Sequence, residues 1–340
     1  MDLSHFNIRT LSKMLRAPDT RSTAAAEFKK TFLQLLDFFV PSPLEFRSLL
    51  VETHSIITGE AALWFAMRAG NERKPTVMDV ICPCYSFENV QMFFRNLPNT
   101  TWTTSLDNTI ENVIQQDEFH GRRTFYIATT KKGIIRVTQS VSHSALHTVP
   151  FQEATHLMNV LTPHLFICPY PTLTLNKMTI AASHDSHTRQ CHDVYKKDEF
   201  IWLTHASTLS TLSFTCYNFP ACPRRDRSFL DAQCLSIRYD LTERQSVAEM
   251  LYKARYTFWR LGGRECGNDR CFLPVRKRVS SEECVYKTDD EIEEMEVNGE
   301  TGGVADEVAD VVQNPHVDDE DALSEGGEPY LERRIDGCSQ

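Results

Sequence analysis

Two short stretches hold the residues whose types and spacing could do chemistry. They run Ile56-Ile57-Thr58-Gly59-Glu60-Ala61-Ala62-Leu63-Trp64-Phe65 and Thr76-Val77-Met78-Asp79-Val80-Ile81. Together they predict a strand, a glycine turn, a helix, a loop and a second strand with a carboxylate near its middle. Asp79 is a candidate metal- or phosphate-site carboxylate, although a polar strand residue is more often bound by a backbone N–H, a Lys or an Arg. Glu60 suits the first turn of a helix, where the dipole stabilises an acid, and Gly59 tolerates positive φ.

This order of elements resembles the nucleotidyltransferase (polymerase-β-like) fold and, more narrowly, a set of uncharacterised fungal proteins built on that fold. Two further stretches match that set, the strand-like run 133–140 and His156-Leu157-Met158-Asn159 leading to residues 168–175. The resemblance covers about residues 44–240. It implies an Asp-x-Asp pair and a third carboxylate that hold two Mg²⁺ ions, and nucleotide phosphates bound at the start of the first core helix, at Gly59 and Glu60.

The sequence keeps the first carboxylate of that pattern, Asp79, and departs from the pattern at the other positions. Ile81 stands two residues after Asp79, where a second carboxylate would share its face of the strand. On the later strand, Arg136, Val137 and Thr138 lie where the third carboxylate is expected. A carboxylate such as Glu60, about 4 Å from a phosphate, costs on the order of 4 kcal/mol at an effective dielectric near 20. The sequence therefore contains the expected strands and helix of the fold, but it lacks the second and third carboxylates that catalysis would require.

We predict a catalytically degenerate protein of this fold that acts as a binding or interaction module, with a protein partner and no cofactor. Asp79 is then a remnant of the catalytic site. One alternative is an active metal-dependent nucleotidyltransferase in which Asp79 and Glu60 bind Mg²⁺ beside a nucleotide. A second alternative is a nucleic-acid-binding protein whose basic face is masked by an acidic tail.

Other clusters carry weaker signals. A polar stretch holds potential zinc ligands, although their spacing matches no closed structural site and favours an exposed loop: His184, His187, Cys191 and His192. The cysteines from Cys216 to Cys284, including Cys222, Cys234, Cys266 and Cys271, lack paired Cys-x2-Cys spacing and favour buried thiols. Basic groups that could contact nucleic acid, but that we interpret first as solvated surface, are Arg122, Arg123, Lys131, Lys132, Arg224, Arg225, Arg227, Arg270, Arg276, Lys277 and Arg278. No phosphate-binding glycine loop or nucleophile motif is present.

The charge is divided unevenly along the chain. Residues 288–340 hold 18 Asp or Glu against two Arg, a formal charge of −16, whereas residues 1–287 carry 34 basic and 28 acidic residues, or +6. So acidic a segment, with one Tyr and no Phe or Trp, is typical of disorder. The eleven irregularly spaced cysteines, and the absence of a leader or spanning segment, favour a reduced cytoplasmic or nuclear protein with no membrane partner.

The elements that must position these residues alternate between helix and strand, which predicts an α/β fold with a mixed sheet. We expect N-terminal helices in residues 1–43, a nucleotidyltransferase-like core at 44–180, a C-terminal extension at 181–287 and the acidic tail at 288–340. Helices are predicted at 7–17, 23–40, 44–52, 60–69, 86–94, 106–119, 151–161, 170–178 and 244–261. Strands are predicted at 55–58, 76–81, 123–130, 133–139, 165–168, 200–217 and 233–239, with a hairpin turn at 131–133.

Overall fold

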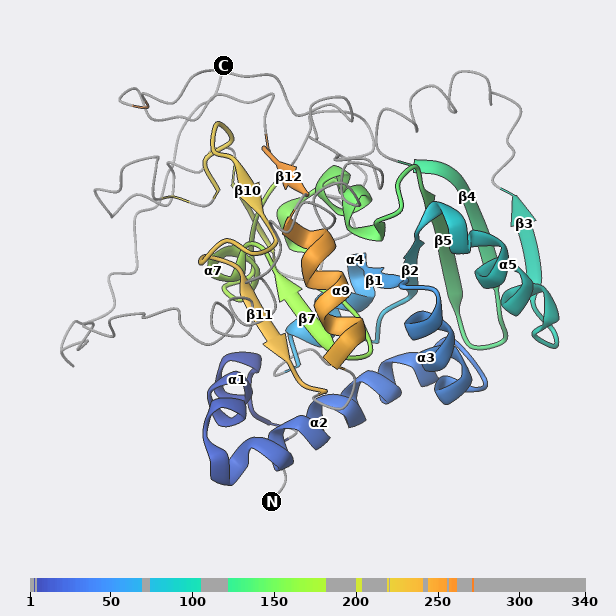
Figure 1. Ribbon diagram of the computed structural model, residues 1–340, viewed down its shortest axis with the longest axis horizontal. Helices are drawn as coiled ribbons and strands as arrows, with labels where there is room; N and C mark the ends of the chain where they lie inside the picture. The colour runs from blue at the N-terminus through green and yellow to red at the C-terminus, as the bar shows by residue number, and fades with distance from the viewer. Residues whose placement is uncertain are drawn as a thin grey trace, which may run out of the picture.

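A mixed eight-stranded sheet forms the centre of the protein (Figure 1). The structure is a computed structural model, and it describes residues 3, 5–68, 74–104, 122–181, 200–203, 219, 221–240, 244–255, 257–261 and 271. The strand order is β11-β7-β6-β1-β2-β5-β4-β3, and two smaller two-stranded sheets pair β10 with β12 and β8 with β9. The predicted α/β class with a mixed sheet is therefore confirmed. The predicted helix 106–119 and the acidic tail lie outside the described residues.

Six of the seven strand pairings in the large sheet are antiparallel, and the seventh, between β2 and β5, is parallel. Strands β4 and β5 form the predicted hairpin, in which the Thr130 N–H donates to the Gly133 carbonyl at 3.0 Å. The strands of the large sheet are β1 (Ile56–Thr58), β2 (Val77–Cys82), β3 (Thr101–Thr104), β4 (Arg122–Thr129), β5 (Ile134–Ser140), β6 (Val160–Leu161), β7 (Leu165–Cys168) and β11 (Leu235–Arg238). The small sheets contain β8 (Met178–Ile180), β9 (Ile201–Leu203), β10 (Arg227–Ser228) and β12 (Phe258–Trp259).

The helices begin close to where the sequence predicts them. Helix α2 starts earlier, at Pro18, because proline at the first helical position has a preset φ and Asp19 favours the positive end of the dipole. The α-helices are α1 (Ile8–Arg16), α2 (Pro18–Asp37), α3 (Pro43–Glu52), α4 (Gly59–Ala66), α5 (Phe87–Asn96), α7 (Pro171–Thr174) and α9 (Arg244–Arg255). Short 3-10 helices lie at η1 (Cys84–Ser86), η2 (Ala145–Phe151) and η3 (Thr155–Leu157).

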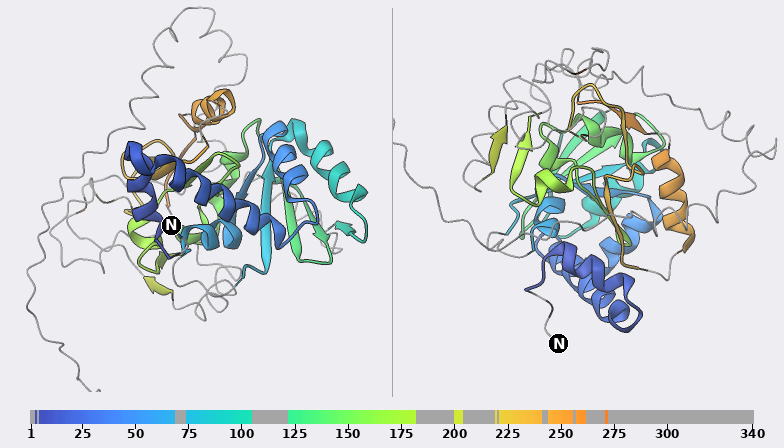
Figure 2. Two further views of the ribbon diagram at one scale, coloured as in Figure 1. Left: turned by 90° about the horizontal axis from the view of Figure 1, so that it is seen from below. Right: turned by 90° about the vertical axis from the view of Figure 1, so that its left-hand side faces the viewer.

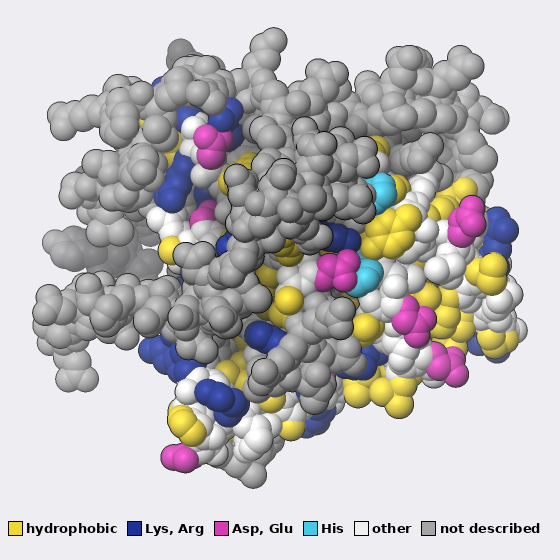
Figure 3. Space-filling view, viewed as in Figure 1, with side chains coloured by type: hydrophobic (Ala, Val, Ile, Leu, Met, Phe, Trp, Pro, Cys, Tyr) yellow, Lys and Arg dark blue, Asp and Glu magenta, His cyan; other side chains and the backbone are white. Residues whose placement is uncertain are grey.

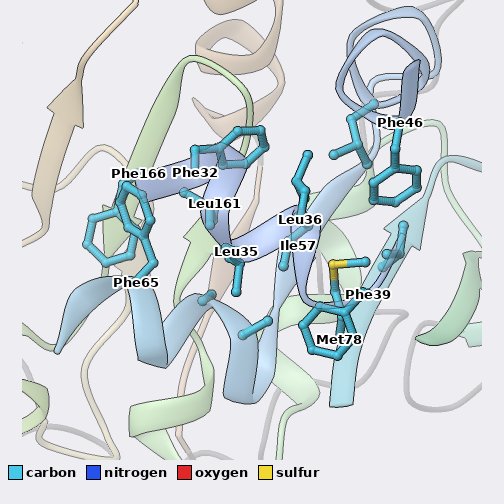
Figure 4. Packing of buried hydrophobic residues seen from close by; sticks show 14 of the residues in the cluster. Phe32, Leu35, Leu36, Phe39, Phe46, Ile57, Phe65, Met78, Leu161 and Phe166 are labelled. Atoms are coloured by element: carbon cyan, nitrogen blue, oxygen red, sulfur yellow. The ribbon is translucent and has the colours of Figure 1, made fainter. Parts of the chain in front are cut away.

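Both faces of the central strands are buried, because adjacent residues along each strand enter different cores. Ile57, Leu161 and Phe166 join the core beneath α2, where Phe32, Leu35, Leu36 and Phe39 pack onto the sheet (Figure 4). Ile56, Val160 and Ile167 join the opposite core, which also contains Val247 and Leu251 of α9. This alternation follows from the two-residue period of a strand. Helices therefore cover both faces, as the turned views also show (Figure 2).

The predicted helix at 151–161 is wrong. The segment instead contains the end of η2, the short η3, and then β6, which joins the sheet between β1 and β7. Its apolar residues mimic a helical pattern because nearly every side chain there is buried, so the spacing selects no face. Polar side chains in this segment form hydrogen bonds with backbone groups that compete with a regular helix. Thr155 Oγ1 accepts from the Ile180 N–H at 3.1 Å, and the Asn159 amide donates to the His156 carbonyl at 2.8 Å.

Two other elements are shorter than expected. Helix α7 has four residues rather than spanning 170–178, and α9 ends at Arg255, before β12 replaces the predicted end of that helix. In the predicted strand 200–217, β9 is described only at Ile201–Leu203, and the remainder lies outside the described residues. Strand β11, from the predicted extension 181–287, pairs with β7 and so belongs to the same sheet as the predicted core.

His156 is a fully buried titratable group in η3. Its Nδ1 lies 2.7 Å from Thr179 Oγ1, and its ring centroid lies 4.6 Å from that of Phe200 and 5.6 Å from that of Trp202. Burial lowers the pKa of His156 to about 3, because the apolar surroundings disfavour the imidazolium. The folded protein therefore holds this ring neutral at pH values where an unfolded chain would protonate it.

We predict that His156→Gln flattens the pH dependence of stability. A depressed folded-state pKa contributes stability that is complete above the unfolded value near 6.5 and is lost as pH falls. Between pH 6.5 and 4.5 the free energy of unfolding, measured by urea unfolding, should fall by about 2 kcal/mol less in the variant than in the parent. Thr179→Val is the matched control, since it removes the partner hydroxyl and keeps the titrating ring. Equal slopes for the parent and His156→Gln would contradict the prediction.

Candidate functional site

The candidate site is centred on Asp79, in the middle of β2. Its backbone register places it opposite Thr58 on one side and Arg136 on the other. The residue is 8% exposed, so its carboxylate lies inside the sheet rather than on an open surface. A carboxylate at that depth needs hydrogen-bond donors to replace water.

Arg136 supplies two of those donors. Its Nε lies 2.5 Å from Asp79 Oδ1 and its Nη2 lies 2.6 Å from Oδ2, a two-point contact between guanidinium and carboxylate. This geometry is the strong form of the ion pair, because both oxygens accept charge-assisted hydrogen bonds at once. The Arg136 side chain is 44% exposed, so the pair is buried at the carboxylate and open at the guanidinium. The expected Lys or Arg partner of Asp79 is thus Arg136.

Gly59 lies directly against the same carboxylate. Its φ is +67°, which confirms the expected turn role, and a Cβ added there would lie 2.2 Å from Asp79 Oδ2. Glycine is required here for two reasons: other residues rarely adopt this positive φ, and a side chain would clash with the Asp79 carboxylate. Gly59 is also the first residue of α4, so the positive end of that helix faces the carboxylate.

Glu60 is held by Thr76, the residue before β2. Its Oε1 accepts from the Thr76 N–H at 3.1 Å and its Oε2 accepts from Thr76 Oγ1 at 2.8 Å. Thr76 precedes Asp79 by three residues, roughly 10 Å along an extended chain. The Glu60 carboxylate is therefore held just before β2 and the Asp79 carboxylate in the middle of that strand, each by its own protein partner.

The residues beside Asp79 on its face of the sheet offer no further acid. Ile81 is 2% exposed and belongs to the core beneath α9. Thr138 pairs with Ile81 across β2 and β5, and Thr58 Oγ1 donates to the Leu157 carbonyl at 3.0 Å. Within the described residues, no three His, Cys, Asp or Glu side chains gather closely enough to hold a metal ion.

The weaker candidates are dispersed or lie beyond the described part of the chain. His184, His187, Cys191 and His192 are outside it, as are Cys216, Cys266, Cys284, Arg270, Arg276, Lys277 and Arg278. Cys222 is buried and packs near Cys271, whereas Cys234 belongs to another core and donates from Sγ to the Ser228 carbonyl at 3.3 Å. Burial raises the pKa of the Cys234 thiol, which keeps it protonated.

Arg227 corrects the interpretation of the predicted basic groups as solvated surface. It is 1% exposed, pairs with Asp231, and donates from Nη2 to the Pro169 carbonyl at 2.7 Å. Its guanidinium carbon also lies 4.7 Å from the Tyr170 ring centroid. Arg225 donates to Gln233 Oε1 at 2.9 Å, and Lys132 pairs with Asp37 at 2.7 Å. Several of these cations therefore serve intramolecular contacts.

Comparison of the chain with protein-family models, with curated proteins and with solved structures finds no match. Over the residues that the structure describes, no helix has the length and apolar character needed to cross a membrane.

Gly59→Ala should lower the free energy of unfolding by about 2 kcal/mol or more, because it combines positive-φ strain with a clash against Asp79. Urea unfolding measures the change. The double variant Gly59→Ala/Asp79→Ala separates the two causes, since it removes the clashing oxygen and keeps the backbone strain. An alanine that costs the same in both backgrounds would show that the close approach to Asp79 does not matter.

Arg136→Met should also destabilise the protein, by about 1–3 kcal/mol, because it leaves the Asp79 carboxylate buried without its charged partner. This loss in the free energy of unfolding is smaller than the cost of breaking a fully buried ion pair, because the Arg136 guanidinium is half-exposed. Adding Asp79→Asn removes the unpaired charge and should restore part of the loss. A double variant no more stable than Arg136→Met in urea unfolding would argue against this account.

Proposed function

We propose that this chain is a catalytically degenerate protein with a nucleotidyltransferase-like core, acting as a binding or interaction module with a protein partner. The observation that carries the proposal is the two-point contact between Arg136 and Asp79. In an active site of this class, both carboxylate oxygens would be available to divalent metal ions. Here each oxygen accepts a hydrogen bond from a guanidinium instead.

Electrostatics supports this proposal. A divalent ion about 4 Å from the Arg136 charge would meet a repulsion of roughly 8 kcal/mol at an effective dielectric near 20, twice the value for two unit charges. Binding would also require the ion to break the existing pair with Asp79. The guanidinium thus supplies the positive charge that a metal would supply, and it does so permanently.

The positions of the remaining groups support the same proposal. Glu60, the other candidate ligand, is held by Thr76 at the start of β2. Ile81 is part of the core and supplies no oxygen. Nucleotidyl transfer by two metal ions about 3.5–4 Å apart needs ligands that grip both ions together. Asp79 alone does not meet that need.

The test is calorimetric titration of the full chain with ATP and with GTP, each with and without Mg²⁺ or Mn²⁺. We expect no metal-dependent binding at nucleotide concentrations up to about 1 mM, a Kd that corresponds to about −4 kcal/mol. Metal-dependent binding that is lost in Asp79→Asn would overturn the proposal and favour an active nucleotidyltransferase.

A second titration tests the role assigned to the guanidinium. Mn²⁺ is added to Arg136→Gln and to Arg136→Gln/Asp79→Asn, after circular dichroism has shown that both are folded. If Arg136 occupies the place of a metal, Arg136→Gln should bind Mn²⁺ more tightly than the parent does, and the double variant should lose that gain. Equal Mn²⁺ binding by the parent and Arg136→Gln would exclude the guanidinium as the barrier.

A further inference from the structure

Helix α1 carries a basic stripe, which we define as Arg9, Lys13 and Arg16. The three residues are four and three positions apart, so they share one face of the helix, and all three are exposed. The opposite face is in the core, where Ile8 is 1% exposed and Leu11 is fully buried. No acidic residue occurs on α1. The charged side chains of α1 are therefore all basic.

The structure around α1 extends this charge. Arg21, an exposed residue of α2, donates from Nε to the Leu15 carbonyl at 3.0 Å and so is held at the C-terminal end of α1. Residues 5–21 contain four Lys or Arg against Asp19, a formal charge of +3. Among the described residues, Arg9 and Arg16 have no acidic partner. Lys and Arg side chains gather over this end of the molecule, at the lower left of Figure 3.

We propose that the basic stripe is a docking site for the acidic segment of the same chain, residues 288–340. That segment carries a formal charge of −16, more than enough to complement the stripe. Its 53 residues span at most about 180 Å when extended, so their length does not limit their reach. Because the two partners belong to one chain, the effective concentration is in the millimolar range, and weak ion pairs suffice for docking.

Two other occupants of the stripe are less well supported. An amphipathic helix that binds membranes inserts its apolar face, but the apolar face of α1 is in the core. Binding of single-stranded nucleic acid combines cations with aromatic platforms, and α1 has no aromatic residue. An intramolecular polyanion would also compete with any external one. The inference does not depend on the proposed function of the Asp79 region.

Carbodiimide cross-linking of the full chain tests the proposal, because this reagent joins a lysine amine directly to a carboxylate. Lys13 reports on the stripe, and the exposed Lys131, in the turn between β4 and β5, is the reference site. At about 10 mM salt, where the Debye length is roughly 30 Å, Lys13 should cross-link to residues 288–340 several times more often than Lys131. At about 1 M salt, where that length is roughly 3 Å, the difference should disappear.

Two variants of equal charge complete the experiment. Arg9→Gln/Arg16→Gln removes the flanking cations and keeps Lys13 as reporter, so the Lys13 cross-link should fall at least about threefold. Arg95→Gln/Lys132→Gln removes the same charge elsewhere and should leave that yield unchanged. Thermal unfolding confirms that both variants remain folded. The yield should also be independent of protein concentration, as an intramolecular contact requires.

Three results would overturn the proposal. These are equal yields at Lys13 and Lys131, equal losses in the two variants, or cross-links that form only between molecules. A single-stranded oligonucleotide, added as a probe, gives the remaining comparison. Binding that depends on Arg9 and Arg16, in a chain whose Lys13 does not cross-link to the acidic segment, would assign the stripe to nucleic acid instead.

Discussion

The bidentate contact between a guanidinium and a carboxylate on adjacent strands fixes the middle of the large sheet. Asp79 and Arg136 face each other across β2 and β5, the parallel pair in that sheet. Gly59 adopts a positive φ and brings the start of α4 against the same carboxylate. Three segments of the chain therefore meet at one buried charge. Gly59 leaves space for the Asp79 carboxylate, and Arg136 neutralises the charge of that carboxylate.

Much of the architecture could be predicted because it is encoded locally. The run from β1 through α4 to β2 has an apolar strand, a glycine and a compact helix in sequence, and the structure follows that order. Prediction failed at residues 151–161, where nearly every side chain is buried and the apolar spacing carries no information about period. There Thr155 and Asn159 decide the backbone, through hydrogen bonds to groups that a pattern of apolar residues does not reveal.

The candidate site divides in the same way. Asp79, Glu60 and Gly59 stand out in the sequence by type and position. Their partners depend on strand register, a long-range property, and Arg136 lies 57 residues from Asp79. The sequence of β5 shows an arginine at the third position of a predicted strand, which is the one indication of a charged partner. The sequence does not specify which carboxylate lies opposite that arginine. Arg227 shows the same limit: its sequence neighbours indicate a surface, while its contacts with Asp231 and Tyr170 are in the interior.

The parallel pairing of β2 with β5 has a consequence for the order of folding. Antiparallel neighbours join through tight turns, whereas parallel neighbours need a long crossover. Here α5, β3 and β4 all lie between β2 and β5 along the chain, so that whole passage must close before Arg136 reaches Asp79. Contacts of such sequence separation carry a large loop-closure entropy and form slowly. The β4–β5 hairpin, in contrast, closes through a short turn. Asp79 therefore gains its charged partner only when this long crossover has closed.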